Sequence, residues 1–106
     1  MVASIDFMDN TCQYTTNKNG RDLFYEECKY PKKNKDGSPN DMYLEELKVK
    51  VDQRKVEVDA LAKELLSPKF VKKMGFGEEV RMGYDKMFIA GQGLGGWTSI
   101  YAACGD

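Results

Sequence analysis

Three glycines near the C-terminus have the spacing of a phosphate-binding turn. Gly91, Gly93 and Gly96 form the pattern G-x-G-x-x-G, behind the apolar residues 87–90 and ahead of residues 97–103. Where such a turn joins a strand to a helix, the absent side chains let backbone amides approach a pyrophosphate closely. The spacing therefore raises nucleotide binding as a possible chemistry, which requires a strand before the glycines and a helix after them.

Locally, this stretch resembles the opening of the flavin- and nicotinamide-binding Rossmann enzymes. The resemblance covers residues 86–103 and implies an oxidoreductase that holds a dinucleotide. It departs from the family pattern because the sequence reaches Asp106 without a second parallel strand or an acidic residue about 20 positions beyond the glycines. A fragment of a dinucleotide-binding oxidoreductase is therefore the second alternative for function.

Residue types that usually perform catalysis or hold a metal are sparse elsewhere in the sequence. Histidine is absent, which removes the commonest general base and the commonest metal ligand. The cysteines form no C-x-x-C pair, and Lys and Arg number 16 against 17 Asp and Glu, so the basic excess of a nucleic-acid binder is missing. We expect a protein that is not an enzyme, with no catalytic residue, metal site, cofactor or nucleic-acid partner.

A β-hairpin is predicted around Asn19-Gly20, because both residues tolerate a positive φ in a tight turn. This turn places residues 11–16 opposite residues 23–28, so that Cys12 lies close to Cys28. Opposed Cβ atoms on neighbouring strands are about 4.5–5.5 Å apart, which is near the reach of a disulfide. An oxidising compartment would favour a Cys12–Cys28 disulfide, and a reducing one would leave two ordinary thiols.

A basic linker at residues 31–37 leads into a long helix predicted over residues 38–66. Ser38 is the expected N-cap, Pro39 takes the first helical position, and Asp41 completes a capping box. The helix is expected to end before the next proline, because proline cannot continue a helix. About 28 residues make a helix about 42 Å long, so it needs a partner to cover it, either the hairpin, a second copy or another protein.

Apolar side chains recur along this helix at heptad spacing, with Arg54 as the one polar member. We call the apolar members the heptad stripe and predict that they contact a partner: Leu44, Leu47, Val51, Val58, Leu61 and Leu65. Val49, Val56 and Ala60 add a weaker apolar stripe beside it. The simpler interpretation is one broad amphipathic face that the protein's own hairpin covers.

Residues 87–104 carry no charge and contain four glycines. As one helix they would measure about 27 Å, close to the thickness of a bilayer core, with Gly91 and Gly95 on a helix-contact face. The alternative is a glycine-rich segment folded against protein. Both interpretations place Gly91, Gly95, Trp97 and Tyr101 against another polypeptide. A basic cluster precedes the segment and would face the inner side of a membrane: Lys69, Lys72, Lys73, Arg81 and Lys86.

The predicted architecture is α+β and mostly helical, in a single domain of 106 residues. Its parts are a segment with the β-hairpin at 1–30, the linker at 31–37, the long helix at 38–66, a short helix and loop at 67–86, and the glycine-rich apolar C-terminal segment at 87–106. The short helix is expected to restart at Ser67-Pro68 and to end at Gly75, which suits the position just past a helix.

This layout indicates a non-catalytic structural or accessory subunit that docks on a larger protein assembly. A membrane complex of the energy-transducing kind is the narrower hypothesis for the host, with membrane contact through residues 87–104. The first alternative is a soluble homo-oligomeric helical module in which Arg54 sets the register. The sequence does not specify a compartment, although an organellar or membrane-associated one suits the narrower hypothesis.

Overall fold

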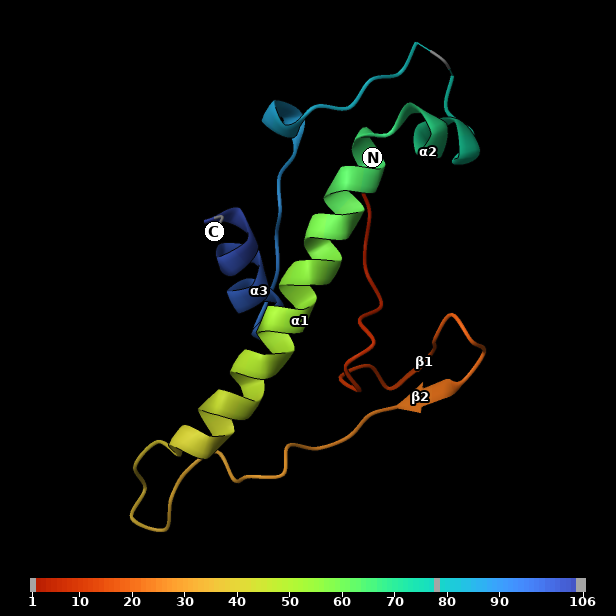
Figure 1. Cartoon of the computed structure of the whole chain (residues 1–106). Helices are drawn as coiled ribbons and strands as arrows, with labels where there is room; N and C mark the ends of the chain where they lie inside the picture. Colours follow the sequence, from red (N-terminus) through yellow and green to blue (C-terminus); the bar gives the residue numbers. More distant parts are fainter. Residues whose placement is uncertain (1, 78, 105–106) are drawn as a thin grey trace. The chain divides into compact units, whose positions relative to one another are not determined.

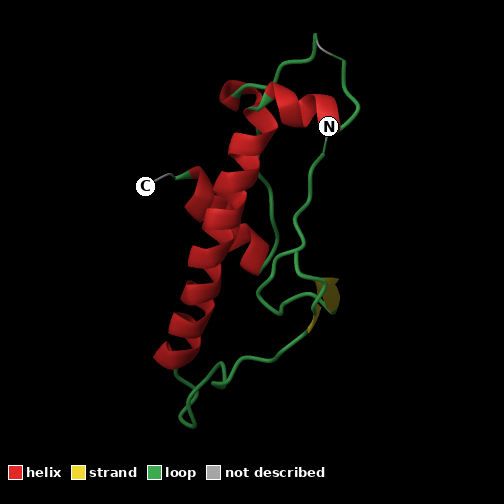
Figure 2. Ribbon diagram, turned by 45° about the vertical axis from the view of Figure 1, so that its right-hand side comes forward, coloured by secondary structure: helices red, strands yellow, loops and turns green. Residues whose placement is uncertain are grey.

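The chain folds as α+β with helices predominating, as the sequence predicts (Figure 1). The computed structural model describes residues 2–77 and 79–104. Loops connect the regular elements over much of the remaining chain (Figure 2). The elements in chain order are β1 (Tyr14–Thr16), β2 (Asp22–Phe24), α1 (Asp41–Leu66), α2 (Pro68–Lys73), the 3-10 turn η1 (Tyr84–Lys86) and α3 (Leu94–Ala103).

The chain divides into two compact units, Met1–Arg54 and Lys55–Asp106. The border falls inside α1, so each unit contains one half of the long helix. Among the described residues, each unit has one apolar residue that is buried, Val51 in the first and Val71 in the second. Both cores are therefore small, and most apolar side chains remain partly or fully in contact with solvent.

The predicted hairpin is present in the first unit as an antiparallel pair of β1 and β2. Thr16 pairs with Asp22, one residue away from the predicted pairing with Leu23. The reason lies in Asn17, whose side-chain oxygen accepts hydrogen bonds from two amides of the turn and whose own amide bonds to the Arg21 carbonyl. The loop consequently has three residues instead of two, with Gly20 at a φ of 77°.

The start of α1 differs from the prediction, because Asn40 and not Ser38 caps the helix. The side-chain oxygen of Asn40 accepts the amide of Met42 at 3.0 Å, as an N-cap residue does. Ser38 belongs to the turn before the helix, where its amide and hydroxyl both donate to Asp36. These bonds lower the pKa of Asp36, with the hydroxyl contributing most. The linker is therefore an ordered turn that delays the helix until Asp41.

In the second unit, Pro68 occupies the first turn of α2 and Gly75 ends the helix, both as predicted. Gly75 has a φ of 89°, its amide donates to the Lys72 carbonyl, and the amide of Phe76 donates to the Val71 carbonyl. This pair of bonds is the Schellman arrangement, which requires a left-handed residue just past the helix. It turns the chain back toward α2.

The C-terminal segment contains a shorter helix than the membrane interpretation needs. Among its described residues, 87–104, only α3, Leu94–Ala103, is helical, and residues 87–93 precede it without forming a regular element. Gly91 and Gly95 therefore do not share one helix face. Within the part of the chain that the structure describes, the helices lack the combination of length and apolar character needed to cross a membrane.

Candidate interaction surface

Arg54 is buried in α1 and is neutralised by Asp9 of the N-terminal segment. Its Nε donates to Asp9 Oδ2 at 2.5 Å, and a terminal nitrogen donates to the Thr11 hydroxyl at 2.5 Å. The guanidinium also lies over the Phe7 ring, 4.4 Å from its centroid. The other oxygen of Asp9 accepts the amide and hydroxyl of Thr11. Together these contacts hold residues 7–11 against the first half of α1.

The charge state of this pair follows from two opposing effects on Asp9. Burial by itself would raise the pKa of Asp9, because it penalises the charged carboxylate. Hydrogen bonds from Arg54 and Thr11, together with the positive charge of Arg54, outweigh burial and leave the pKa of Asp9 below its ordinary value. Asp9 is therefore ionised at neutral pH and balances Arg54, so the pair serves to position the N-terminal segment.

The heptad stripe is partly occupied by the chain's own fold. Val51 is only 1% exposed and belongs to the core of the first unit, which corrects its prediction as a partner contact. Leu44 is exposed and keeps that role as a prediction. The remaining members are half-buried and retain only part of their surface for a partner: Leu47, Val58, Leu61 and Leu65.

A more exposed face of α1 lies along the second, weaker stripe. Val49 and Val56 are 67% and 68% exposed, and Met42, seven residues before Val49, is exposed as well. Ala60, four residues after Val56, is also exposed. Residues at these spacings share one side of a helix. We call Met42, Val49, Val56 and Ala60 the exposed α1 face.

The C-terminal segment contributes large apolar side chains that are also exposed. Phe88 is 99% exposed, and both of the predicted contact residues Trp97 and Tyr101 are exposed. Ile89 and Ile100 are exposed as well. We call Phe88, Trp97 and Tyr101 the C-terminal aromatic residues. Lys55 lies 6.0 Å from the centre of the Tyr101 ring, so this ring also has a cationic neighbour within the second unit.

The glycines of this segment approach one another within the chain. A Cβ on Gly91 would stand 2.6 Å from the Ser99 hydroxyl oxygen and closer still to the backbone of Gly95. The space that a side chain would fill at Gly91 is therefore occupied by the first turns of α3. The described residues 87–90 form no strand, so the strand-turn-helix context of a dinucleotide site is not seen around these glycines.

Cys12 and Cys28 are free thiols in the structure, as is Cys104. The Cys12 thiol faces the Phe7 carbonyl at 4.0 Å, and Lys50 Nζ lies 4.0 Å from the sulfur of Cys28. Each of the two cysteines thus has its own neighbour in the first unit. With the observed register, the residue opposite Cys12 would be Glu26, which agrees with the separate environments of the two thiols.

Sequence reasoning identified Arg54 as the odd member of the heptad stripe but not its partners Asp9, Thr11 and Phe7. A buried cation needs a counter-ion, so the signal for an acidic partner was present. With 17 acidic residues in the chain, nothing in the local pattern singled out Asp9, which lies 45 positions away.

Among residues 2–77 and 79–104, no group of three or more Cys, Asp or Glu side chains is arranged to hold a metal ion. Comparisons of the chain with protein-family models, with curated proteins and with solved structures found no match.

Proposed function

We propose that this chain is a non-catalytic accessory subunit that docks on a larger protein assembly. The observation that supports this most is the exposed α1 face, where Met42, Val49 and Val56 repeat every seven residues in contact with solvent. Single exposed apolar residues are common on proteins and need no explanation. A row of them at heptad spacing is the pattern by which one helix packs on another.

Burial of the exposed α1 face against a partner would stabilise a complex, but not enough to hold the complex together by itself. Full burial of a valine or methionine side chain contributes about 1.5–3 kcal/mol, so covering what is exposed at three positions supplies about 3–6 kcal/mol. Association costs at least about 4 kcal/mol in lost freedom. A stable complex therefore needs further contacts, which the C-terminal aromatic residues and Leu44 can supply.

The narrower form of the proposal takes the host to be a membrane complex of the energy-transducing kind. Its support is the uncharged stretch 87–104 together with the exposure of Phe88, Trp97 and Tyr101. Tryptophan and tyrosine suit a surface that is apolar on one side and wet on the other. An organellar or membrane-associated location would follow from such a host.

The test compares a double variant with a control in cells of the source organism. Native gels separate the tagged proteins, and mass spectrometry identifies their partners. The three proteins are the wild type, the double variant Val49→Asp/Val56→Asp and the control Val2→Asp. Val2 is an exposed valine outside the α1 face. We expect the wild type and Val2→Asp to migrate with the same larger assembly, and the double variant to migrate alone with unchanged helix content. The wild type migrating alone, or the double variant staying with the assembly, would count against the proposal.

A soluble homo-oligomer is the second candidate, because the heptad repeat of the exposed α1 face is equally suited to a second copy of the helix. Light scattering on the purified chain separates the two. A stable oligomer that dissociates in Val49→Asp/Val56→Asp would favour this candidate, whereas a monomer would favour docking on another protein. A bound flavin or nicotinamide chromophore in the same material would favour the oxidoreductase fragment instead.

A further inference from the structure

The turn of the hairpin contains an asparagine that is followed by a glycine. Such a pair is prone to react with itself, because the amide nitrogen of the following residue can reach the carbonyl carbon of the asparagine side chain. Glycine allows this approach best, since it has no Cβ to block it and its backbone is the least restricted. Only one asparagine of the chain, Asn19, precedes a glycine; the full set is Asn10, Asn17, Asn19, Asn34 and Asn40.

The other four asparagines are held by hydrogen bonds of their side chains. Asn17 accepts two amides of the turn, and Asn40 caps α1. Asn10 and Asn34 each donate to a backbone carbonyl. Asn19 is exposed, and within residues 2–77 and 79–104 its side chain forms no hydrogen bond. Its side chain is therefore the one that can turn toward the next amide without losing a partner.

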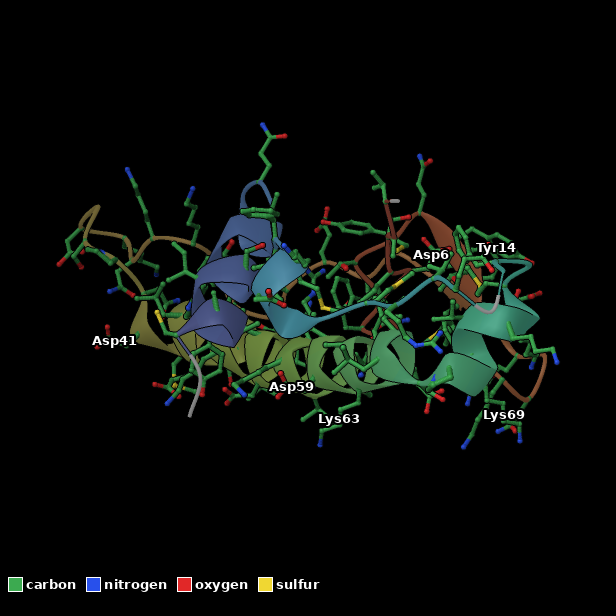
Figure 3. The ribbon with its side chains drawn as sticks, turned by 90° about the horizontal axis from the view of Figure 1, so that it is seen from above. Asp6, Tyr14, Asp41, Asp59, Lys63 and Lys69 are labelled. Atoms are coloured by element: carbon green, nitrogen blue, oxygen red, sulfur yellow. The ribbon has the colours of Figure 1, made fainter. Side chains whose placement is uncertain are left out.

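The backbone around Asn19 is restrained by the hairpin itself. The amide of Gly20 donates to the Asn17 carbonyl at 3.0 Å and must leave it before its nitrogen can attack. Both strands are three residues long, with two exposed residues and a half-buried middle one. Tyr14, labelled in Figure 3, adds a contact with Phe24 across the strands, with ring centroids 5.5 Å apart. A two-stranded hairpin of this kind is only marginally stable, so we expect its turn to open while the rest of the chain stays folded.

We propose that Asn19 is a self-modification site, at which the folded chain deamidates through a cyclic imide with Gly20. The Gly20 amide gives its proton to hydroxide, and its nitrogen attacks Cγ of Asn19. The new C–N bond closes the imide ring, and the side-chain nitrogen leaves as ammonia. Water then adds to either ring carbonyl, and the C–N bond at that carbonyl breaks. Opening at the side-chain carbonyl gives aspartate, and opening at the main-chain carbonyl gives isoaspartate.

The two products should affect the hairpin differently. Both add a carboxylate, which changes the formal net charge of the chain from −1 to −2. Isoaspartate also routes the main chain through the former side chain and so lengthens the three-residue loop by one backbone atom. The bonds that close this loop, from Asn17 to Arg21 and from Gly20 to Asn17, cannot all keep their geometry after that insertion. The hairpin should therefore loosen in the isoaspartate form. The site lies in the first unit, and the inference does not depend on the proposed docking function.

The experiment incubates the purified full chain in mildly acidic and mildly alkaline buffer and follows each asparagine by peptide mapping with mass spectrometry. Deamidation raises the mass of a peptide by about 1 Da. We expect the peptide with Asn19 to react many times faster than the other four, with both isoaspartate and aspartate as products. Its rate should rise several-fold with each unit of pH, because the attack needs a deprotonated amide. Earlier reaction at another asparagine, or a product without isoaspartate, would overturn the proposal.

Two variants separate the chemistry from its effect on the hairpin. Gly20→Asn keeps a residue that tolerates the φ of 77°, and a Cβ there meets no other atom, so the turn should persist. Its side chain shields the nitrogen, so the fast reaction at Asn19 should be lost. Asn19→Asp carries the charge of the products on an unaltered main chain. Amide exchange at residues 14–16 and 22–24 should be faster in the isoaspartate form than in Asn19→Asp. Undiminished deamidation in Gly20→Asn would overturn the cyclic route, and equal exchange would overturn the effect on the hairpin.

Discussion

Replacing Asp9 by asparagine should remove a large share of this protein's stability. Asparagine keeps the shape of the side chain and can still accept hydrogen bonds from Thr11, but it carries no charge. Arg54, whose side chain is 8% exposed, would then be buried without its counter-ion. Breaking a buried ion pair from one side is costly, because the remaining charge has lost the water that would otherwise solvate it.

The expected loss is about 3 kcal/mol in the free energy of unfolding. The removal of one partner from a buried pair costs about 3–5 kcal/mol. The lower end applies here, because the Phe7 ring lies against the guanidinium and still attracts it. Domains have total stabilities of about 5–15 kcal/mol, and the small cores of this chain favour the lower part of that range. The Asp9→Asn protein should thus be only marginally folded.

Urea unfolding followed by far-ultraviolet circular dichroism measures the effect. The control is Asp59→Asn, which breaks the part-buried Lys55–Asp59 pair of 2.8 Å within α1. Water still reaches the Asp59 carboxylate, which is 46% exposed, so this change should cost less than about 1 kcal/mol. A double-mutant cycle with Arg54→Met isolates the coupling of Asp9 to Arg54, and we expect about 2–3 kcal/mol.

Two results would refute this reasoning. If Asp9→Asn were no more destabilising than Asp59→Asn, the buried pair would not contribute more than a pair that water partly solvates. If the coupling of Asp9 to Arg54 were below about 0.5 kcal/mol, the two side chains would act independently.

Three further expectations concern individual contacts of the fold. The difference in unfolding free energy between the wild type and Asp9→Asn should be constant above the ordinary carboxyl pKa of about 3.9. This difference should shrink as the pH falls from about 3.9 through the lowered pKa of Asp9 in the folded protein, because protonated Asp9 no longer balances Arg54. Urea unfolding over a pH series measures it, and a difference that acid leaves unchanged would contradict the expectation. Asn40→Ala should cost about 1 kcal/mol by loss of the helix cap, and Ser38→Ala should cost less; the reverse order in thermal unfolding would restore the predicted cap. Gly91→Ala should cost about 1–3 kcal/mol, because its methyl group meets the Gly95 backbone. A methyl group at Gly95 would face open space, so Gly95→Ala should be neutral or stabilising. Amide hydrogen exchange in α3 should therefore become faster in Gly91→Ala only. Equal exchange rates in the two variants would count against the close approach of Gly91 to Gly95.

The elements of this fold could be predicted from the sequence because their signals are local. Asn19-Gly20 specified a hairpin turn, and the heptad spacing before Pro68 specified a helix that ends at Leu66. Gly75 marked the end of α2, since a left-handed residue is needed there. Each of these signals lies within a few residues of the structure it produces, so it can be recognised before any tertiary contact is known.

Details that depend on competition between neighbouring groups were predicted less well. Ser38 and Asn40 are both good cap residues. Ser38 donates its amide and hydroxyl to Asp36, and Asn40 caps the helix instead. The observed hairpin register likewise differs by one residue from the predicted register, because the side chain of Asn17 stabilises a three-residue loop. The alternatives differ by only about one hydrogen bond, too small a difference to be decided from residue types.

The sequence by itself determined that α1 and α2 are helical and that the long helix needs something to cover it. Only the tertiary structure decided which of 17 acidic residues neutralises Arg54, that Gly91 packs on Gly95, and that Val51 is buried while Val49 and Val56 are exposed. The physical reason is distance along the chain. A pairing across 45 residues depends on how whole segments meet, and residue spacing contains no information about that meeting.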